Sequence, residues 1–188
     1  WLAAAGFSDF AGSTLVHSTG GAAALAGALM LGPRLGRFTK SGSPAPVKPF
    51  AASSIPLVTI GVFVLWLGWF GFNGGSQLAI GTADDAIAVS TIFLNTFLAG
   101  AGGVMAAAIV TRLNFGKTDV VQMLNGCIGG LVAITAEPLT PGPITAMFIG
   151  SIGAIIMYFG TKLLQSYGLD DVVGAIPAHL VAGVWGTL

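Results

Sequence analysis

Residues 55–76 read IPLVTIGVFVLWLGWFGFNGGS and contain no charged side chain. A transmembrane α-helix needs about 20 consecutive apolar residues, so this run is long enough to cross a hydrocarbon core of about 30 Å. The run lacks the alternation of apolar and polar residues that marks a membrane β-strand. Since only helices and closed barrels satisfy their backbone hydrogen bonds within lipid, the stretch predicts a transmembrane helix.

The rest of the chain has the same character. Of its 188 residues, 54% are hydrophobic and only 7% are charged, whereas about 25% are charged in a typical soluble domain. The apolar stretches predict six spans, at about residues 10–32, 55–83, 86–111, 120–136, 143–164 and 172–188. We therefore predict an all-α fold, a polytopic transmembrane helix bundle in a lipid bilayer. The formal net charge is zero, so no basic field is available to bind nucleic acid.

Glycine is unusually frequent, with 29 residues. Pairs at four-residue spacing, Gly71 with Gly75 and Gly126 with Gly130, predict a close approach of helix backbones. The chain opens on Trp1 rather than Met and carries no signal-peptide pattern, so we expect it to be a segment of a longer protein.

The charged residues gather in the connections between the predicted spans. Lys and Arg occur in the connections 33–54, 112–119 and 162–171, whereas the connections after the second and fourth spans carry only acidic residues. The positive-inside rule places the three basic connections on the cytoplasmic side. The first span then enters the membrane from outside, and the last span enters it from inside.

Two histidines stand inside predicted spans, and both belong to the same short motif. Residues 9–17 read DFAGSTLVH and residues 171–179 read DVVGAIPAH, so both follow the pattern D-x-x-G-x-x-x-x-H. Ionisable residues within a membrane are costly and usually functional. Matched motifs in helices of opposite direction indicate an inverted-topology repeat, which places a transport site at the bilayer midplane. Eight residues rise about 12 Å, close to half of the core, so His17 and His179 are predicted to meet.

The motif residues also have structural interpretations. A single histidine in a membrane helix is often a hydrogen-bonded packing residue, but two histidines with matching Asp and Gly offsets favour a functional pair. For Asp9 and Asp171, capping of a helix N-terminus explains the position at least as well as contact with a substrate does.

An aromatic stripe lies in the second span. Trp69, Phe72 and Ser76 are three and four residues apart, so a helix places them on one face near its outer end. An aromatic face with a hydroxyl one turn further out can select a small cation through cation–π attraction and a hydrogen bond. The alternative is an aromatic belt, since such residues are common at membrane interfaces.

Taken together, these residues resemble the ammonium transporter family (Amt/Mep/Rh). The resemblance rests on the run 9–17, on Gly68-Trp69-Phe70-Gly71-Phe72-Asn73 leading to Ser76, and on Asp170-Asp171 leading to His179. These motifs occur in the family's order. The resemblance covers the whole chain as the fifth to tenth of eleven helices, so it implies that residues 1–188 are part of an ammonium transporter domain.

The resemblance implies a role for each matching residue. It makes His17 and His179 the twin pore histidines, and Phe72 one of two phenylalanines that close the outer mouth. The other assignments are a serine of the external ammonium site, a pore-wall tryptophan and a threonine near the vestibule, at Ser76, Trp69 and Thr135 respectively. Asp9 matches an aspartate that supports the vestibule, and Asp171 is its counterpart at the last helix.

Three residues depart from the family pattern. Pro177 stands where most members have glycine, Ala178 replaces a larger valine, and Gln77 replaces a small residue. A proline at this position can kink the helix that carries His179 and alter the pore width. The family's second gate phenylalanine and external-site tryptophan would precede Trp1.

By this resemblance, the expected function is ammonium transport across a plasma or inner membrane, with methylammonium as an analogue. Ammonium loses a proton on entering an apolar pore, because burial disfavours the charged form, and ammonia then passes the histidines. The resemblance also implies a homotrimer and a PII-type regulator of the full-length protein, with no cofactor and no catalytic residue.

Two other functions fit parts of the pattern. An ammonium-sensing receptor would have a family-like membrane domain fused to a signalling module. A membrane enzyme would use His17 and His179 as metal ligands, but two histidines without another inward carboxylate or thiol are too few for a zinc site. We therefore expect no metal.

Overall fold

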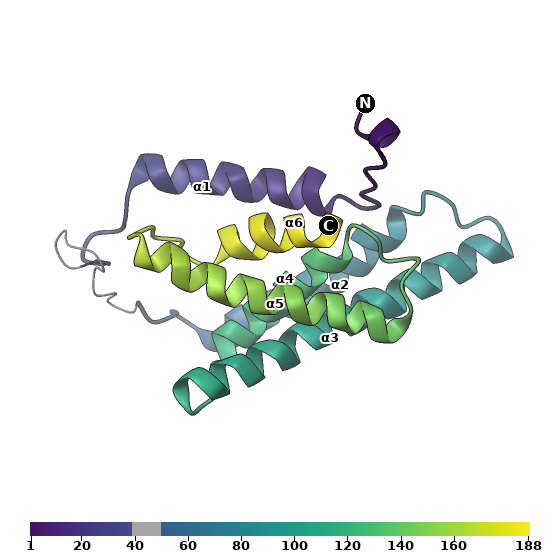
Figure 1. Ribbon diagram of the computed structural model, residues 1–188. Coiled ribbons are helices and arrows are strands. Elements are labelled where there is room, and N and C mark those ends of the chain that lie inside the picture. The colour runs from purple at the N-terminus through teal and green to yellow at the C-terminus, as the bar shows by residue number, and fades with distance from the viewer. Residues whose placement is uncertain (39–49) are drawn as a thin grey trace.

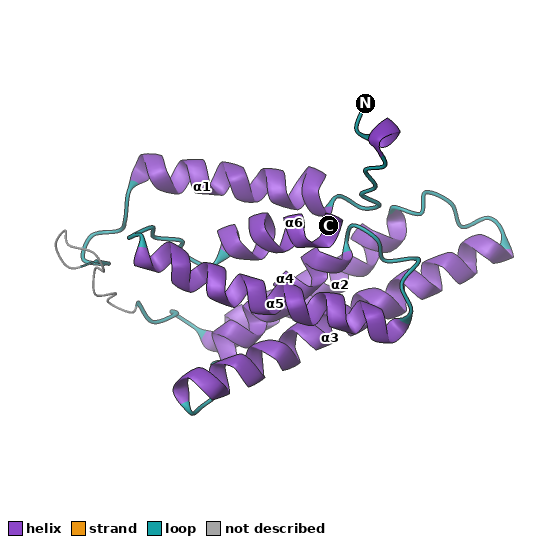
Figure 2. Cartoon of the chain, in the orientation of Figure 1, coloured by secondary structure: helices purple, strands orange, loops and turns teal. Residues whose placement is uncertain are grey.

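The computed structural model describes residues 1–38 and 50–188, and in this part every regular element is helical (Figures 1 and 2). The elements are the 3₁₀-helix η1 (Ala3–Ala5), the π-helices η2 (Ser13–Ser18) and η3 (Ile176–Val181), and the α-helices α1 (Thr19–Leu31), α2 (Ile55–Gly75), α3 (Ala83–Phe115), α4 (Val120–Ile134), α5 (Pro143–Ser166) and α6 (Ala182–Thr187). The predicted all-α class is confirmed. Two of the basic residues behind the predicted orientation, Lys40 and Lys48, lie outside the described residues.

Four helices in the described ranges are long and apolar enough to cross a membrane. They are Ser13–Leu31, which joins η2 to α1, and α2, α3 and α5. The helix α4 is also apolar but has only 15 residues, and the stretch predicted as the last span contains the short helices η3 and α6. The count of six spans therefore stays a prediction.

Successive helices run back and forth between two ends of the bundle (Figure 1). The described parts of the three basic connections, 33–54, 112–119 and 162–171, all lie toward the left side in that view. The turns that join α2 to α3 and α4 to α5 lie at the right end. This arrangement has the alternation that the positive-inside rule predicts.

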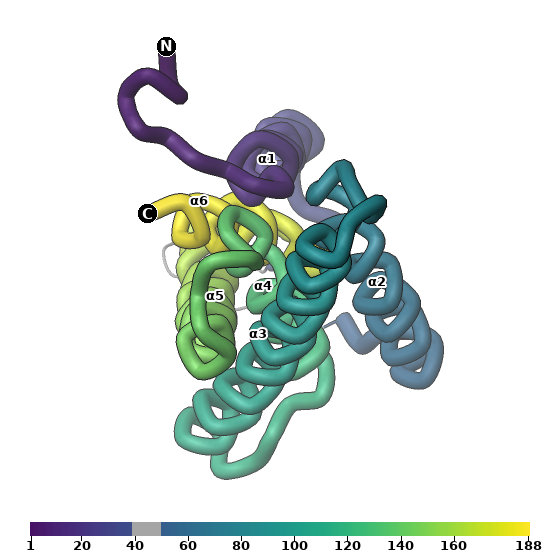
Figure 3. The backbone as a smooth tube through the Cα atoms, turned by 90° about the vertical axis from the view of Figure 1, so that its right-hand side faces the viewer, coloured from purple at the N-terminus to yellow at the C-terminus, as the bar shows by residue number. Residues whose placement is uncertain are grey.

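The helix α4 lies at the centre of the bundle, with α3 and α5 against it (Figure 3). Its residues 126–134 are all buried. A Cβ atom on Gly126 would lie 2.7 Å from the carbonyl oxygen of Gly103, and one on Gly130 would lie 3.3 Å from the Gly103 Cα. Glycine is thus required where α3 and α4 touch through their backbones, as the spacing of Gly126 and Gly130 predicts.

The second predicted span ends earlier than expected. The helix α2 stops at Gly75, eight residues before the predicted end at 83. The next helix begins there with a capping box, in which the Thr82 hydroxyl accepts from the Asp85 N–H and the Asp85 carboxylate accepts from the Thr82 N–H. Added Cβ atoms at Gly71 and Gly75 meet nothing within 4 Å, so no helix of the described residues packs closely on this pair, and close packing there stays a prediction.

Candidate functional site

The helix that carries His17 begins with a carboxylate over its first N–H groups. The Asp9 side chain accepts hydrogen bonds from the backbone N–H groups of Ser13 (2.7 Å), Thr14 (3.0 Å) and Leu15 (2.8 Å). Between Asp9 and Ser13, Gly12 takes a φ of 103°, which L side chains rarely adopt. The motif thus turns the chain sharply into the π-helix η2, with Asp9 satisfying N–H groups that the helix leaves unpaired.

The helix that carries His179 begins in the same way. The Asp171 carboxylate accepts from the N–H groups of Gly174 (3.0 Å), Ala175 (3.0 Å) and Ile176 (2.7 Å). Gly174 has a φ of 80°, and the π-helix η3 follows. In Figure 1 the two histidine-bearing segments run in opposite directions. The shared sequence pattern therefore folds into one local structure used twice, in the manner of an inverted repeat.

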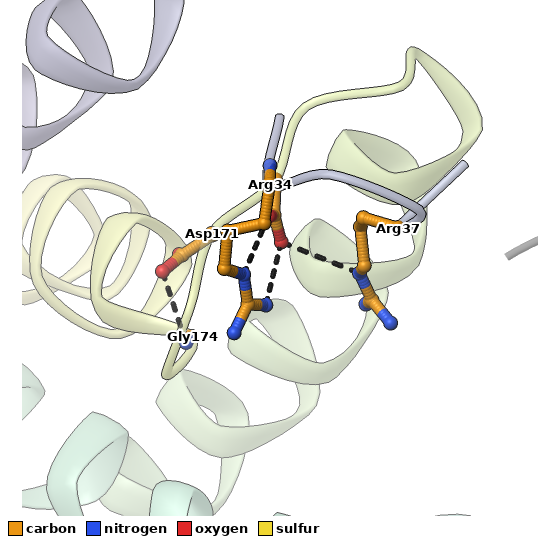
Figure 4. A network of polar contacts seen from close by, with 5 residues as sticks. Arg34, Arg37, Asp171 and Gly174 are labelled. Atoms are coloured by element: carbon orange, nitrogen blue, oxygen red, sulfur yellow. Dashed lines mark hydrogen bonds and ion pairs between the residues drawn. The ribbon is translucent and has the colours of Figure 1, made fainter. Parts of the chain in front are cut away.

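An ion pair with a buried carboxylate lies beside the second of these turns (Figure 4). The Asp170 side chain, only 2% exposed, accepts from Arg34 Nε at 2.7 Å and Nη2 at 2.8 Å, and Arg37 Nε lies 3.3 Å away. These hydrogen bonds from the Arg34 guanidinium lower the pKa of Asp170 to about 2, and they raise the pKa of Arg34. The ion pair thereby joins the connection that follows α1 to Asp170, the residue next to the capping Asp171.

The two histidines meet between these helices. Their Nδ1 atoms lie 3.1 Å apart, and their rings are stacked with centroids 5.2 Å apart. The backbones approach closely next to them, because Gly21 of α1 packs on the backbone of Leu180. In a neutral pair one Nδ1 donates and the other accepts. The Nε2 atom of His17 is buried and has no hydrogen-bond partner among the described residues.

Aromatic rings of α2 cover the histidine pair. The Trp69 ring stacks on His17 at 5.0 Å with an interplanar angle of 13°, and the Phe72 ring lies 5.3 Å from His17. The Trp69 Nε1 donates to Thr135 Oγ1 at 2.9 Å, and Thr135 is fully buried. Thr135 therefore holds the tryptophan from behind. Ser76 lies just past the end of α2 and donates to the Phe72 carbonyl oxygen at 2.8 Å.

A cavity of about 590 Å³ joins these groups. Most of its lining is apolar, and no Asp, Glu, Lys or Arg of the described chain lines it. The lining consists of His17, Val58, Val62, Val64, Leu65, Gly68, Trp69, Phe72, Asn125, Ile128, Val173, Gly174, Ala175, Ala178 and His179. Four of the eight residues singled out in the sequence are thus in its wall. The other four, Asp9, Asp171, Thr135 and Ser76, lie outside the lining.

Sequence reasoning missed Asn125. It lines the cavity from α4 and donates through Nδ2 to the Val173 carbonyl oxygen at 3.0 Å. The available signal was an amide side chain within the predicted apolar span 120–136, where an uncompensated polar group is costly. The π-helical geometry of η2 and η3 was also missed. No metal-binding group of three or more His, Cys, Asp or Glu side chains occurs among residues 1–38 and 50–188.

Comparison with known proteins places the chain in a family. Residues 1–188 match the family model described as Ammonium Transporter Family. Ammonium transporter Amt2 of Archaeoglobus fulgidus is 44% identical over 180 residues, which cover 96% of this chain and 37% of that protein. A putative ammonium transporter of Synechocystis sp. is 43% identical over 188 residues, covering 100% of this chain and 33% of that protein.

The fold is also shared with solved structures of the same kind. One named Sensor Amt Protein superposes with a TM-score of 0.92 at 37% identity, covering 100% of this chain and 44% of that chain. The chain therefore spans well under half the length of the relatives it matches. Its apolar helices and these matches identify a multi-pass membrane protein, and the curated relatives are named as transporters and not as enzymes. The chain belongs to the ammonium transporter family.

Proposed function

We propose that the cavity between α2 and the two histidine-bearing helices forms part of a conduction path for ammonium, crossed as ammonia. The observation that carries the proposal is a hydrogen-bonded pair of histidines in the wall of a cavity with no charged lining residue. An apolar wall disfavours the charged form of any amine that enters it. Ammonium therefore gives up a proton before it passes, and neutral ammonia crosses.

The histidine pair supplies the polar groups that ammonia needs. The Nδ1–Nδ1 hydrogen bond of 3.1 Å fixes both rings and leaves each Nε2 as the other hydrogen-bonding atom. For His17 this Nε2 is buried and has no partner within the described chain. An ammonia molecule in the cavity can satisfy it, either as donor or as acceptor. The pair can therefore hold ammonia, or pass a proton from one end of the cavity toward the other.

The aromatic end of the cavity suits the incoming cation. Phe72 is 38% exposed and its ring lies 5.9 Å from that of Trp69. Aromatic faces attract a cation within about 6 Å. The Ser76 hydroxyl donates to the Phe72 carbonyl and keeps its own oxygen lone pairs, which can accept an N–H of ammonium. We assign Phe72, Trp69 and Ser76 to this recruitment role, with Asp9, Asp171 and Thr135 as supports of the pore helices and of Trp69.

The experiment is uptake of radiolabelled methylammonium by cells that express the full-length protein. His17→Ala and His179→Ala each abolish uptake on this proposal. Thr19→Ala is the matched control, because Thr19 is exposed, follows His17 by two residues and does not line the cavity. If both histidine variants take up methylammonium as fast as the unmodified protein does, with equal amounts of protein in the membrane, the proposal is contradicted.

Ammonium sensing is a second candidate, favoured by the likeness to the structure named Sensor Amt Protein. A receptor would use the same cavity to bind ammonium while a fused signalling module reads the result. Flux separates the two functions: a transporter moves methylammonium into vesicles, whereas a receptor binds ammonium without moving it. Sequence beyond residue 188 that encodes a signalling module would also favour the receptor.

The resemblance to the family supports two further proposals about assembly. One is a homotrimer with a pore in each subunit, and the other is a PII-type regulator of the full-length protein. The mass of the detergent-solubilised protein tests the first, since a monomer contradicts it. Co-purification with an added PII-type protein tests the second.

A further inference from the structure

The wall of the cavity holds a third side chain with hydrogen-bonding capacity to spare, besides the two histidines. Of the lining residues, only His17, His179, Trp69 and Asn125 carry polar side-chain atoms. The single N–H of Trp69 is already donated to Thr135. Asn125 is different, because its amide has both a donor group and an acceptor oxygen.

The acceptor atom of Asn125, Oδ1, is the one without a hydrogen-bond partner in the described chain. Its Nδ2 donates to the Val173 carbonyl at 3.0 Å. Since a carbonyl oxygen only accepts, chemistry fixes the amide with nitrogen toward Val173. No residue of the described chain donates to the Asn125 Oδ1. Gly174 leaves the room that the amide occupies, since a Cβ on Gly174 would lie 2.8 Å from Nδ2.

Asn125 lies on the other side of the histidine pair from Phe72. Phe72 is near the end of α2 at Gly75, whereas Val58, near the start of α2, lines the same cavity. Phe72 follows Val58 by 14 positions, a rise of about 21 Å along the helix. Asn125 follows the start of α4 and contacts the turn at 173–174, and these segments belong to the end of the bundle with the basic connections (Figure 1). A molecule moving along the cavity from Phe72 thus meets the histidines first and Asn125 second.

We propose that Asn125 Oδ1 is a second binding station for ammonia, where an N–H of the molecule is accepted after it leaves the histidine pair. This rests on the proposed conduction function. Ammonia has three N–H donors, and only acceptors such as this amide oxygen can satisfy them in an otherwise apolar wall. Asn125 also positions the turn that starts the His179 helix.

Three side chains of nearly equal shape separate these roles in the full-length protein. Asn125→Asp keeps an acceptor oxygen, and Asn125→Leu keeps neither acceptor nor donor. The readout is the ratio of ¹⁵N-ammonium uptake to ¹⁴C-methylammonium uptake in the same cells. Changes in folding or expression affect both substrates equally and leave this ratio unchanged. Asn114→Leu is the control, because Asn114 is exposed and does not line the cavity.

Asn125→Leu is expected to lower ¹⁵N-ammonium uptake about five-fold, the value of one neutral hydrogen bond, and the ratio falls by the part of this loss that methylammonium does not share. Methylammonium loses less, because it has one N–H fewer to satisfy and its methyl group can pack on leucine. Asn125→Asp keeps the ratio near that of the unmodified protein. An unchanged ratio in Asn125→Leu, or an equal fall of the ratio in Asn125→Leu and Asn125→Asp, overturns the proposal that Asn125 Oδ1 binds ammonia. Absence of uptake by the unmodified protein overturns the conduction function itself, and with it this role of Asn125.

Discussion

Gly21 sets the distance between the two histidine-bearing helices. It lies four residues after His17, and a Cβ there would be 2.8 Å from the Cα of Leu180, the residue after His179. Ordinary van der Waals contact begins at 3.4 Å, and the Leu180 N lies even closer to this Cβ than the Cα does, so Gly21→Ala must move the backbones apart by at least about 0.6 Å. A shift of that size along the line of the two rings would lengthen the Nδ1–Nδ1 distance of 3.1 Å to about 3.7 Å, beyond a hydrogen bond.

The expected result is at least a roughly tenfold loss of methylammonium uptake. A displacement of about 1 Å at a reacting site can cost about 100-fold in rate, and overpacking costs about 1–3 kcal/mol of stability. Gly20→Ala is the matched control, because a Cβ at Gly20 meets nothing within 4 Å. Uptake is measured in cells and normalised to protein in the membrane. Equal uptake by Gly20→Ala and Gly21→Ala would refute the link between helix spacing and the histidine pair.

Two further predictions concern the supports of the site. Thr135→Val leaves the buried Trp69 Nε1 without its acceptor, which costs about 1–3 kcal/mol of stability. The melting temperature in detergent and methylammonium uptake should therefore both fall, whereas Thr135→Ser keeps the hydroxyl and should retain both. A Thr135→Val protein with unchanged melting temperature and uptake contradicts this. The folded pKa of Asp170, about 2, is below the unfolded value of about 3.9, so its stabilising effect is present above pH 4 and is lost as the pH falls through 2. Melting temperatures measured across this range should therefore fall more for the unmodified protein than for Asp170→Asn, and parallel curves would count against the ion pair.

The class of fold and the pairing of the histidines could be predicted because both depend on local patterns. The run 55–76 lacks charge over a length that only a membrane-type helix explains, and it forms α2. The repeated D-x-x-G-x-x-x-x-H spacing encodes a complete local structure, a carboxylate over free N–H groups and a glycine at positive φ. Two copies in opposite directions bring His17 and His179 to the same depth.

The rest of the site depends on contacts between distant segments, which periodicity does not reveal. Thr135 contacts Trp69 across 66 positions, and Asp170 contacts Arg34 across 136. Asn125 reaches the cavity only because α4 packs beneath the turn at 173–174. The end of α2 was also missed, since a continuing apolar composition hides the turn before the Thr82 capping box.

The most direct test of the central claim is to block the cavity and measure transport. Gly68 lines the cavity and a Cβ there meets nothing within 4 Å, whereas Gly71 has equal room on the same helix but lies outside the lining. Gly68→Cys and Gly71→Cys are introduced into full-length protein whose uptake is insensitive to a bulky methanethiosulfonate. We predict that the reagent stops methylammonium uptake through Gly68→Cys, that dithiothreitol restores it, and that Gly71→Cys is unaffected. Undiminished uptake through fully labelled Gly68→Cys would contradict the claim that this cavity is the path.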